Sequence, residues 1–351
     1  MKRYKDIYQK IYDYDNLYLA YLSARLNKRH RSEVMAFTEH LEENLIELQN
    51  ELIWHTYEVG KYREFYVRDP KRRLIMALPF RDRVVQWAIY RQINPLLDKR
   101  YISTSYACRI GGGTQRAIHQ LQQYLRHTPG RVYVLKLDVS KYFYRVDHEV
   151  LLNILQRIFK DRELLELLEK IIKGDGRRFG IDLDTGERCA ETGMPIGNLT
   201  SQMFANLYLN ELDQFIKHKL HQKRYIRYMD DMAIVGNDKA ALRAAWLSVD
   251  AFLRYNLHLQ LNRKSGIESA KQGIDFCGYR VYTDHIKLRK KAAKKMKHRL
   301  KYLQKQFARG EIKTQDFQTT LVSYLGLLKH CDSYRLVEKM LEDFKLQRNR
   351  K

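Results

Sequence analysis

Two adjacent aspartates interrupt an otherwise apolar segment, and this feature constrains the fold more than any other in the chain. Asp230 and Asp231 stand in RYIRYMDDMAIVG, with aromatic and aliphatic residues on both sides. The pattern predicts two short strands joined by a turn, with the acids at the tip of the hairpin. Two like charges placed side by side repel each other unless a cation lies between them. The segment therefore predicts a cation site at the end of a β-hairpin.

A third acid ends another apolar strand further upstream. Asp138 follows the β-branched and apolar run in RVYVLKLDV. If the two strand systems lie side by side in one sheet, Asp138, Asp230 and Asp231 meet at one edge. Oxygen ligands suit Mg²⁺, and two such ions stabilise the attacking and leaving oxygens of a phosphoryl transfer. We therefore predict a catalytic site with two Mg²⁺ ions on these three carboxylates.

The charge of the chain favours a polyanionic partner. The sequence has 65 Lys and Arg against 41 Asp and Glu, a net charge of +24, and neutralised phosphates release counterions. An anionic membrane surface would suit the same charge, but no apolar run approaches the ~18 residues of a spanning helix. MKRYKDIYQK also lacks the apolar stretch of a signal peptide. The four cysteines are too widely spaced for a CxxC metal site and fit reduced thiols. We expect a cytoplasmic protein that binds nucleic acid and no membrane.

Helical and strand patterns follow one another without a flexible linker or an internal repeat, which favours one continuous catalytic unit. We expect hairpins in YREFYVRDPKRRLIMALPF and around Asp184-Thr185-Gly186. Nine Lys and Arg lie between Ile286 and Lys301, and we expect this segment to grip nucleic acid. The expected helices are 32–52 with Ser32 as its cap, 82–97, 114–125 with Thr114 as its cap, 199–220, and the chain from Lys287 onward.

The ordered motifs of the chain resemble those of reverse transcriptases. YMDD matches the YxDD box of that family, and LDVSKYFYRVDH matches its first catalytic motif. The ordered set spans residues 60–285 and consists of FRDRVVQ, SYACRIGGGTQRAI, Asp138, GMPIGNLTSQ, YMDD, LNRKSGI and DFCGYRVY. The resemblance implies an RNA-directed DNA polymerase, a nucleotidyltransferase that binds template RNA, the RNA/cDNA duplex and dNTPs.

The same resemblance implies an α+β fold shaped like a right hand. N-terminal helices and fingers are expected in residues 1–130. A palm with an antiparallel sheet and interleaved fingers elements is expected in 131–285. A helical, basic thumb is expected in 286–351.

The resemblance also implies roles for individual residues around the incoming nucleotide. Phe143 follows Asp138 at the position of an aromatic steric gate, whose ring excludes a ribose 2′-hydroxyl group. Lys71 and Arg73 fall where related enzymes clamp the triphosphate, with Arg68 as a rival.

Further implied roles lie closer to the metal ions and the template. The backbone carbonyl group of Val139 is expected to join the aspartates as a metal ligand. Lys264 in LNRKSGI matches a family lysine and is expected to protonate the departing pyrophosphate. Arg109 stands at a position that the family places close to the template strand.

One motif departs from the common family pattern. Most relatives carry Gln-Gly followed by Ser-Pro, whereas GMPIGNLTSQ has Ile196 in place of that Gln and Gln202 in place of the Pro. Ile196 and Gly197 are expected at the nucleotide site. This form is similar to the enzymes of diversity-generating retroelements, which copy RNA into cDNA mutated at template adenines. That resemblance implies a small basic accessory protein, known in this group as a helical pentamer, and no maturase, integrase, RNase H or endonuclease domain.

Three other interpretations remain open. The first is a reverse transcriptase of another class, such as a group II intron or retron enzyme. The second is an antiphage or priming enzyme that makes untemplated DNA. The third is a non-catalytic RNA-binding protein on a polymerase scaffold, against which the intact Asp138, Asp230 and Asp231 argue.

Overall fold

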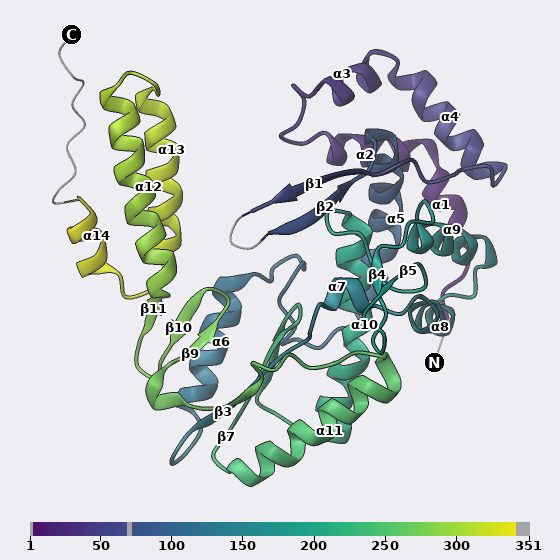
Figure 1. The fold of residues 1–351 in the computed structure, drawn as a ribbon. Helices are drawn as coiled ribbons and strands as arrows, with labels where there is room; N and C mark the ends of the chain where they lie inside the picture. Colours follow the sequence, from purple (N-terminus) through teal and green to yellow (C-terminus); the bar gives the residue numbers. More distant parts are fainter. Residues whose placement is uncertain (1–2, 69–71, 342–351) are drawn as a thin grey trace.

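The computed structural model describes residues 3–68 and 72–341, in which helices and antiparallel sheets are both abundant. This content confirms the predicted α+β class. In Figure 1 the N-terminal helices lie on one side, a long helical hairpin stands on the other, and the main sheet lies below and between them. Within the described ranges, no helix combines the length and the apolar character that crossing a membrane requires.

The N-terminal region is a helical cluster that carries a two-stranded hairpin. The hairpin pairs Arg63 with Ala77 and Val67 with Arg73, as expected from the alternating pattern. Asp69, Pro70 and Lys71 at its predicted turn lie outside the described residues. The elements are α1 (Tyr8–Tyr12), α2 (Tyr14–Ala24), α3 (Ser32–Glu39), α4 (Leu41–Ile53), β1 (Arg63–Val67), β2 (Arg73–Ala77) and α5 (Phe80–Asp98).

Two predicted helix caps are wrong by one residue, and the segment predicted as one helix over 32–52 forms two helices. Ser32 is the first residue of α3, and Arg31 occupies the cap position. The helix breaks at His40, where the Asn44 side chain satisfies the terminal carbonyl group of Phe37 over 3.0 Å. Gly113 replaces Thr114 as the cap of α6 (Thr114–Arg126), because its φ of 107° suits glycine alone.

The main sheet has four antiparallel strands in the order β6-β7-β3-β8. Alternate side chains of β3 enter two different cores, with Leu135 and Leu137 on one face and Val134 on the other. The first face packs on α10 and α11, and the second on α6. These elements are β3 (Tyr133–Asp138), β6 (Tyr225–Tyr228), β7 (Asp231–Gly236), β8 (Gly266–Ser269), α10 (Leu199–Gln214) and α11 (Lys239–Leu257).

The segments between these strands contain the hairpin predicted around Asp184 and the helix predicted over 199–220. The hairpin around Asp184 is present as β4 (Gly180–Ile181) and β5 (Arg188–Cys189). The predicted helix 199–220 is α10 followed by the π-helical turn η1 (Phe215–Lys219). Three short helices precede them, namely α7 (Tyr142–Arg145), α8 (His148–Ile158) and α9 (Arg162–Lys173).

The C-terminal region begins as a sheet rather than as the predicted helix. Lys287 lies in a strand, because Ile286 and Leu288 pair with β10. A helical hairpin follows, with its own apolar core. The elements are η2 (Ala270–Gln272), β9 (Ile274–Phe276), β10 (Tyr279–Val281), β11 (Ile286–Leu288), α12 (Lys290–Ala308), α13 (Thr314–Leu328) and α14 (Tyr334–Leu341).

Candidate active site

The strand register places two of the three predicted carboxylates side by side. Asp138 ends β3 and pairs directly with Asp231, the first residue of β7. Paired residues in an antiparallel sheet project to the same face. Asp230 precedes Asp231 in the turn, after Met229 with a φ of 53°. The two strand systems therefore adjoin as the sequence analysis expected.

The turn is electrostatically crowded. Burial, followed by the negative charges of Asp138 and Asp231, raises the pKa of Asp230 to about 6. The cation of Arg73 acts in the opposite direction, so this β2 residue lies close enough to the turn to affect it. Asp231 is compensated within the chain by an ion pair with Lys136. The Lys136 ammonium group also lies 4.5 Å from the centre of the Phe276 ring.

The segment before β8 fixes Asp138. The side-chain amide of Asn262 donates to the carboxylate of Asp138 over 2.9 Å. The main-chain amide of Asn262 donates to the Asp138 carbonyl oxygen over 2.7 Å, and the Ser265 hydroxyl accepts from the Asp138 amide over 3.2 Å. Asp138 is thus held from both its main chain and its side chain.

The donor set suits a hard divalent cation. Its oxygen atoms come from three acids whose mutual repulsion is already evident in the pKa of Asp230. Within residues 3–68 and 72–341, however, no three His, Cys, Asp or Glu side chains are gathered as a preassembled metal site. Asp231 is instead turned to Lys136. Val139 is buried and forms an antiparallel β-bridge with Leu261. The two main-chain hydrogen bonds on either side of this bridge do not involve the carbonyl group of Val139.

The described residues that were expected around the nucleotide lie in α7, in the turn before α10 and at the start of β2. Phe143 is half-buried in α7, and its ring packs edge-on against Tyr142 at 5.6 Å. Ile196 is half-buried against the small core beneath β2, and Gly197 is exposed. Arg73 is exposed at the start of β2, and Lys71 lies outside the described residues.

The other predicted cations differ in their availability. Lys264 is exposed, and only its main-chain amide makes a described bond, to Asn262. Arg68 is exposed beside the hairpin turn. Arg109 is committed within the chain, because its guanidinium group binds Asp98 at 2.6 Å and the carbonyl oxygens of Ile102 and Ser105. These bonds close the loop between α5 and α6.

A basic stripe lies on the exposed face of α12. We name it the α12 lysine stripe: Lys291, Lys294, Lys301 and Lys305. Their helical spacing places them opposite the buried residues of the same helix, Met296, Leu300, Leu303 and Phe307. The lysines therefore face solvent together.

Two charged residues near the site were missed by the sequence analysis. Lys136 and Arg227 both interrupt apolar strands, in VLKLD and YIRYM. A cation in a strand that is buried on both faces is itself a signal, because burial requires a charged partner. Their partners, Asp231 and Asp213, become visible only when the elements are assembled.

Comparison with known proteins agrees with these motifs. The family model for reverse transcriptase (RNA-dependent DNA polymerase) matches residues 68–281, more than half of the chain. Protein YkfC of Escherichia coli (strain K12) is 28% identical over 272 residues, 67% of this chain and 70% of that protein. The group II intron-encoded protein LtrA of Lactococcus lactis subsp. cremoris is 25% identical over 165 residues, which cover 46% of this chain and 26% of LtrA.

Two further similarities are to a plant protein and to a fungal structure. Nuclear intron maturase 1, mitochondrial, of Arabidopsis thaliana is 30% identical over 38% of this chain and 21% of that protein. A structure of telomerase from Candida albicans has a TM-score of 0.47 at 13% identity, covering 82% of this chain and 56% of that chain. The family match over residues 68–281 and the antiparallel sheet that carries Asp138 and Asp231 lead to one assignment. The chain belongs to the reverse transcriptase (RNA-dependent DNA polymerase) family and has its right-hand polymerase fold.

Proposed function

We propose that this chain is an active RNA-directed DNA polymerase whose reaction centre is built on Asp138, Asp230 and Asp231. The observation that carries the proposal is the direct pairing of Asp138 with Asp231 at the end of β3 and β7, with Asp230 beside them. These carboxylates, with the Val139 carbonyl group, would hold two Mg²⁺ ions. Bound there, the ions supply charge stabilisation for the attacking and leaving oxygens.

The remaining proposed roles belong to the side chains of the chain itself. Asn262 and Ser265 orient Asp138 through the bonds described above. Phe143 excludes the ribose 2′-hydroxyl group, and Arg73 with Lys71 binds the triphosphate. Lys264 provides a proton to the departing pyrophosphate from its ammonium group.

We also propose the division of labour that the family resemblance implies. Residues 1–130 form the fingers and the N-terminal helices, residues 131–285 the palm, and residues 286–351 the thumb. The α12 lysine stripe contacts the phosphates of the template RNA and of the RNA/cDNA duplex, since exposed cations at helical spacing bind a backbone without reading its sequence.

The finer proposal is membership of the diversity-generating retroelement group. It is supported by Ile196 and Gln202, which stand where most relatives have Gln and Pro. An apolar side chain at position 196 cannot exchange hydrogen bonds with a forming base pair. We infer that the cDNA is mutated opposite template adenines and that a small basic accessory protein takes part.

The polymerase proposal is tested by primer extension on a defined RNA. Asp230→Ala should abolish extension while RNA binding is largely retained, because affinity comes from cations distributed over the surface. Asp184→Ala, at an exposed aspartate in the β4–β5 turn, is the matched control and should extend normally. Near wild-type extension by Asp230→Ala would refute the assignment of the reaction centre.

The group proposal is tested by deep sequencing of cDNA made with and without the accessory protein. An excess of errors opposite template adenines supports it. Accurate cDNA under both conditions would place the chain in another class of reverse transcriptase. Product that does not follow the added RNA would indicate untemplated synthesis.

A further inference from the structure

Arg227 is the largest side chain that the structure buries completely, with an exposure of 0%. It lies in β6, and its side chain enters the face of the main sheet that packs on α10. The acids Asp138 and Asp231 belong to the opposite face, because Lys136 and Val134 share their side of β3. We call residues 229–231 the acidic turn. Arg227 therefore lies on the face of the sheet opposite to Asp138 and Asp231 and reaches the acidic turn from that face.

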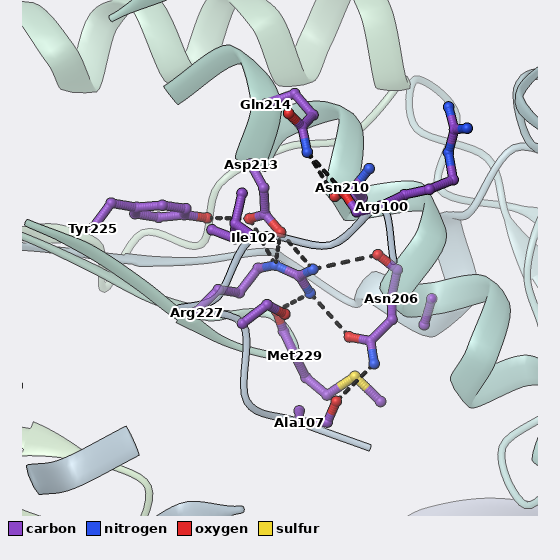
Figure 2. Close-up of polar contacts among 12 residues, drawn as sticks. Arg100, Ile102, Ala107, Asn206, Asn210, Asp213, Gln214, Tyr225, Arg227 and Met229 are labelled. Carbon is purple, nitrogen blue, oxygen red and sulfur yellow. Dashed lines mark hydrogen bonds and ion pairs between the residues drawn. The ribbon is translucent and has the colours of Figure 1, made fainter. Parts of the chain in front are cut away.

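Most bonds of the guanidinium group go to α10. Its Nε binds both carboxylate oxygens of Asp213 over 2.8 and 2.9 Å, and one terminal nitrogen binds Asp213 over 2.7 Å. Asn206 accepts two further bonds, through its side-chain oxygen and its carbonyl oxygen. Burial alone lowers the pKa of Arg227, but the charge and hydrogen bonds of Asp213 outweigh it and raise the pKa above its ordinary value. Figure 2 shows the guanidinium group at the centre of this cluster.

One bond leaves α10 and reaches the acidic turn. The guanidinium group donates to the carbonyl oxygen of Met229 over 3.3 Å, as Figure 2 shows. Met229 has a φ of 53°, a left-handed conformation that methionine rarely adopts. Such a conformation persists only where surrounding contacts impose it. Because Asp230 is the next residue, the bond to Met229 constrains the peptide that presents Asp230.

The same cluster forms hydrogen bonds with the loop before α6. The Arg227 amide donates to the Thr104 carbonyl oxygen over 3.0 Å, and the Tyr106 amide donates to the Arg227 carbonyl oxygen over 3.1 Å. The Asn206 side chain donates to the Ala107 carbonyl oxygen over 2.7 Å. Arg227 thus joins α10, the loop 104–107 and the acidic turn at one point.

We propose that Arg227, anchored by Asp213, is a positioning residue that holds the Met229 turn and thereby sets the orientation of Asp230. The inference rests on the proposed role of Asp230 in polymerisation. The pair of Arg227 and Asp213 then does more than stabilise the fold, because one guanidinium bond goes to the acidic turn and not to α10.

The conservative change Arg227→Lys tests the geometry. An ammonium group keeps the charge beside Asp213 but cannot replace the planar fork that also reaches Asn206 and Met229. We expect kcat to fall about tenfold to a hundredfold, the scale of a lost charged hydrogen bond, with KM for template RNA unchanged. Tyr208→Phe is the matched control, because it removes an equally buried bond from α10 to Leu257, away from the turn. It should retain wild-type kcat.

A second variant separates positioning from stability. The combination Arg227→Met, Asp213→Leu and Tyr225→Phe removes both buried charges and the tyrosine hydroxyl group that donates to Asp213. Apolar replacement of a buried ion pair is commonly neutral or stabilising, so this variant is expected to fold. A positioning role predicts that its kcat remains low. Recovery of wild-type kcat in this variant would overturn the inference.

A readout without metal or substrate completes the test. The ¹³C-methyl NMR signal of Met229, assigned with Met229→Leu, reports on the turn, and the Met296 signal from the core of the C-terminal helices reports on global folding. Arg227→Lys should shift or broaden the Met229 signal and leave that of Met296 in place. An unchanged Met229 signal with wild-type kcat would refute the proposal. If Asp230→Ala still polymerises, the proposed function fails instead.

Discussion

The main-chain amide of Met76 donates a hydrogen bond to the carbonyl oxygen of Ile196 over 3.0 Å. Met76 lies in β2, so this bond joins the β1–β2 hairpin to the turn before α10. Gly197 follows with a φ of 126°, and a Cβ atom there would lie 3.1 Å from the Met76 carbonyl oxygen. Position 197 therefore requires glycine, whereas the side chain of position 196 can change without breaking the bond to β2.

Ile196→Gln should lower misincorporation opposite template adenines more than opposite other bases. The amide restores a hydrogen-bonding group worth ~1 kcal/mol, or about fivefold in discrimination. Deep sequencing of cDNA from one RNA template measures the change base by base. Ile196→Leu, which stays apolar, is the control and should keep the wild-type error pattern. An adenine bias that Ile196→Gln leaves unaltered would place the source of infidelity elsewhere.

Phe143→Ala should admit ribonucleotides. The half-buried ring is proposed to exclude the 2′-hydroxyl group by its volume, so truncation removes a steric barrier without adding affinity. The measurement is the ratio of kcat/KM for a dNTP to that for the matching rNTP, which should fall. Tyr142→Phe keeps the neighbouring ring and serves as the control. If activity falls while the ratio is constant, Phe143 is a packing residue only.

Lys136→Met should increase the affinity of the chain for Mg²⁺. The ammonium group neutralises Asp231 and is only 12% exposed, so it competes with any other cation at that carboxylate. We expect the half-saturating Mg²⁺ concentration in thermal unfolding to fall about tenfold, equivalent to ~1.4 kcal/mol. The Tm of the variant without Mg²⁺ should be lower than that of the wild type, because like charges lose their counter-ion.

The matched control for this change is Lys239→Met. The Lys239 ammonium group lies 4.8 Å from the centre of the ring of Tyr133 in β3, so this lysine also contacts an aromatic ring. Its removal should leave the Mg²⁺ titration as in the wild type. Identical titrations for Lys136→Met and the wild type would show that Lys136 does not compete for Asp231.

Neutralising the α12 lysine stripe should weaken nucleic-acid binding uniformly across sequences. Changing Lys291, Lys294 and Lys301 to Gln removes up to three phosphate contacts, so the slope of log Kd against log salt concentration should decrease by up to about three. Binding of one RNA/DNA duplex at several salt concentrations gives the slope. The control carries the same change at three exposed lysines elsewhere: Lys160, Lys219 and Lys223. Equal slopes for the two variants would mean that the stripe only faces solvent.

The sequence predicts local patterns well and pairings across the fold poorly. The strands around Asp138 and Asp230 were predictable because apolar runs ending in acids have few structural solutions. The start of the C-terminal helix was misjudged at Lys287, because lysine-rich composition concealed the alternation of Ile286 and Leu288. Strand pairing with β10 outweighs helix propensity there.

The partners of the buried charged residues were also not predictable from the sequence. Arg227 is visible in the sequence as a cation within an apolar strand, but its task depends on Asp213, which reaches it from α10. Likewise, the apolar neighbours of Lys136 do not reveal that Asp231 is its partner. Such partners are set by sheet register and helix packing, which a single sequence does not encode in any local pattern.

Only Arg289 separates β11 from α12, and its amide donates to the carbonyl oxygen of Gly278 over 3.3 Å. Gly278 lies in the turn between β9 and β10 beside Cys277, whose thiol is close enough to Asp231 that burial and this carboxylate together raise its pKa. These contacts connect the start of α12 to the turn that carries Asp231. Under the proposed function, in which α12 holds the product duplex, we therefore expect a mechanical load on that duplex to reach this turn and to change the polymerisation rate.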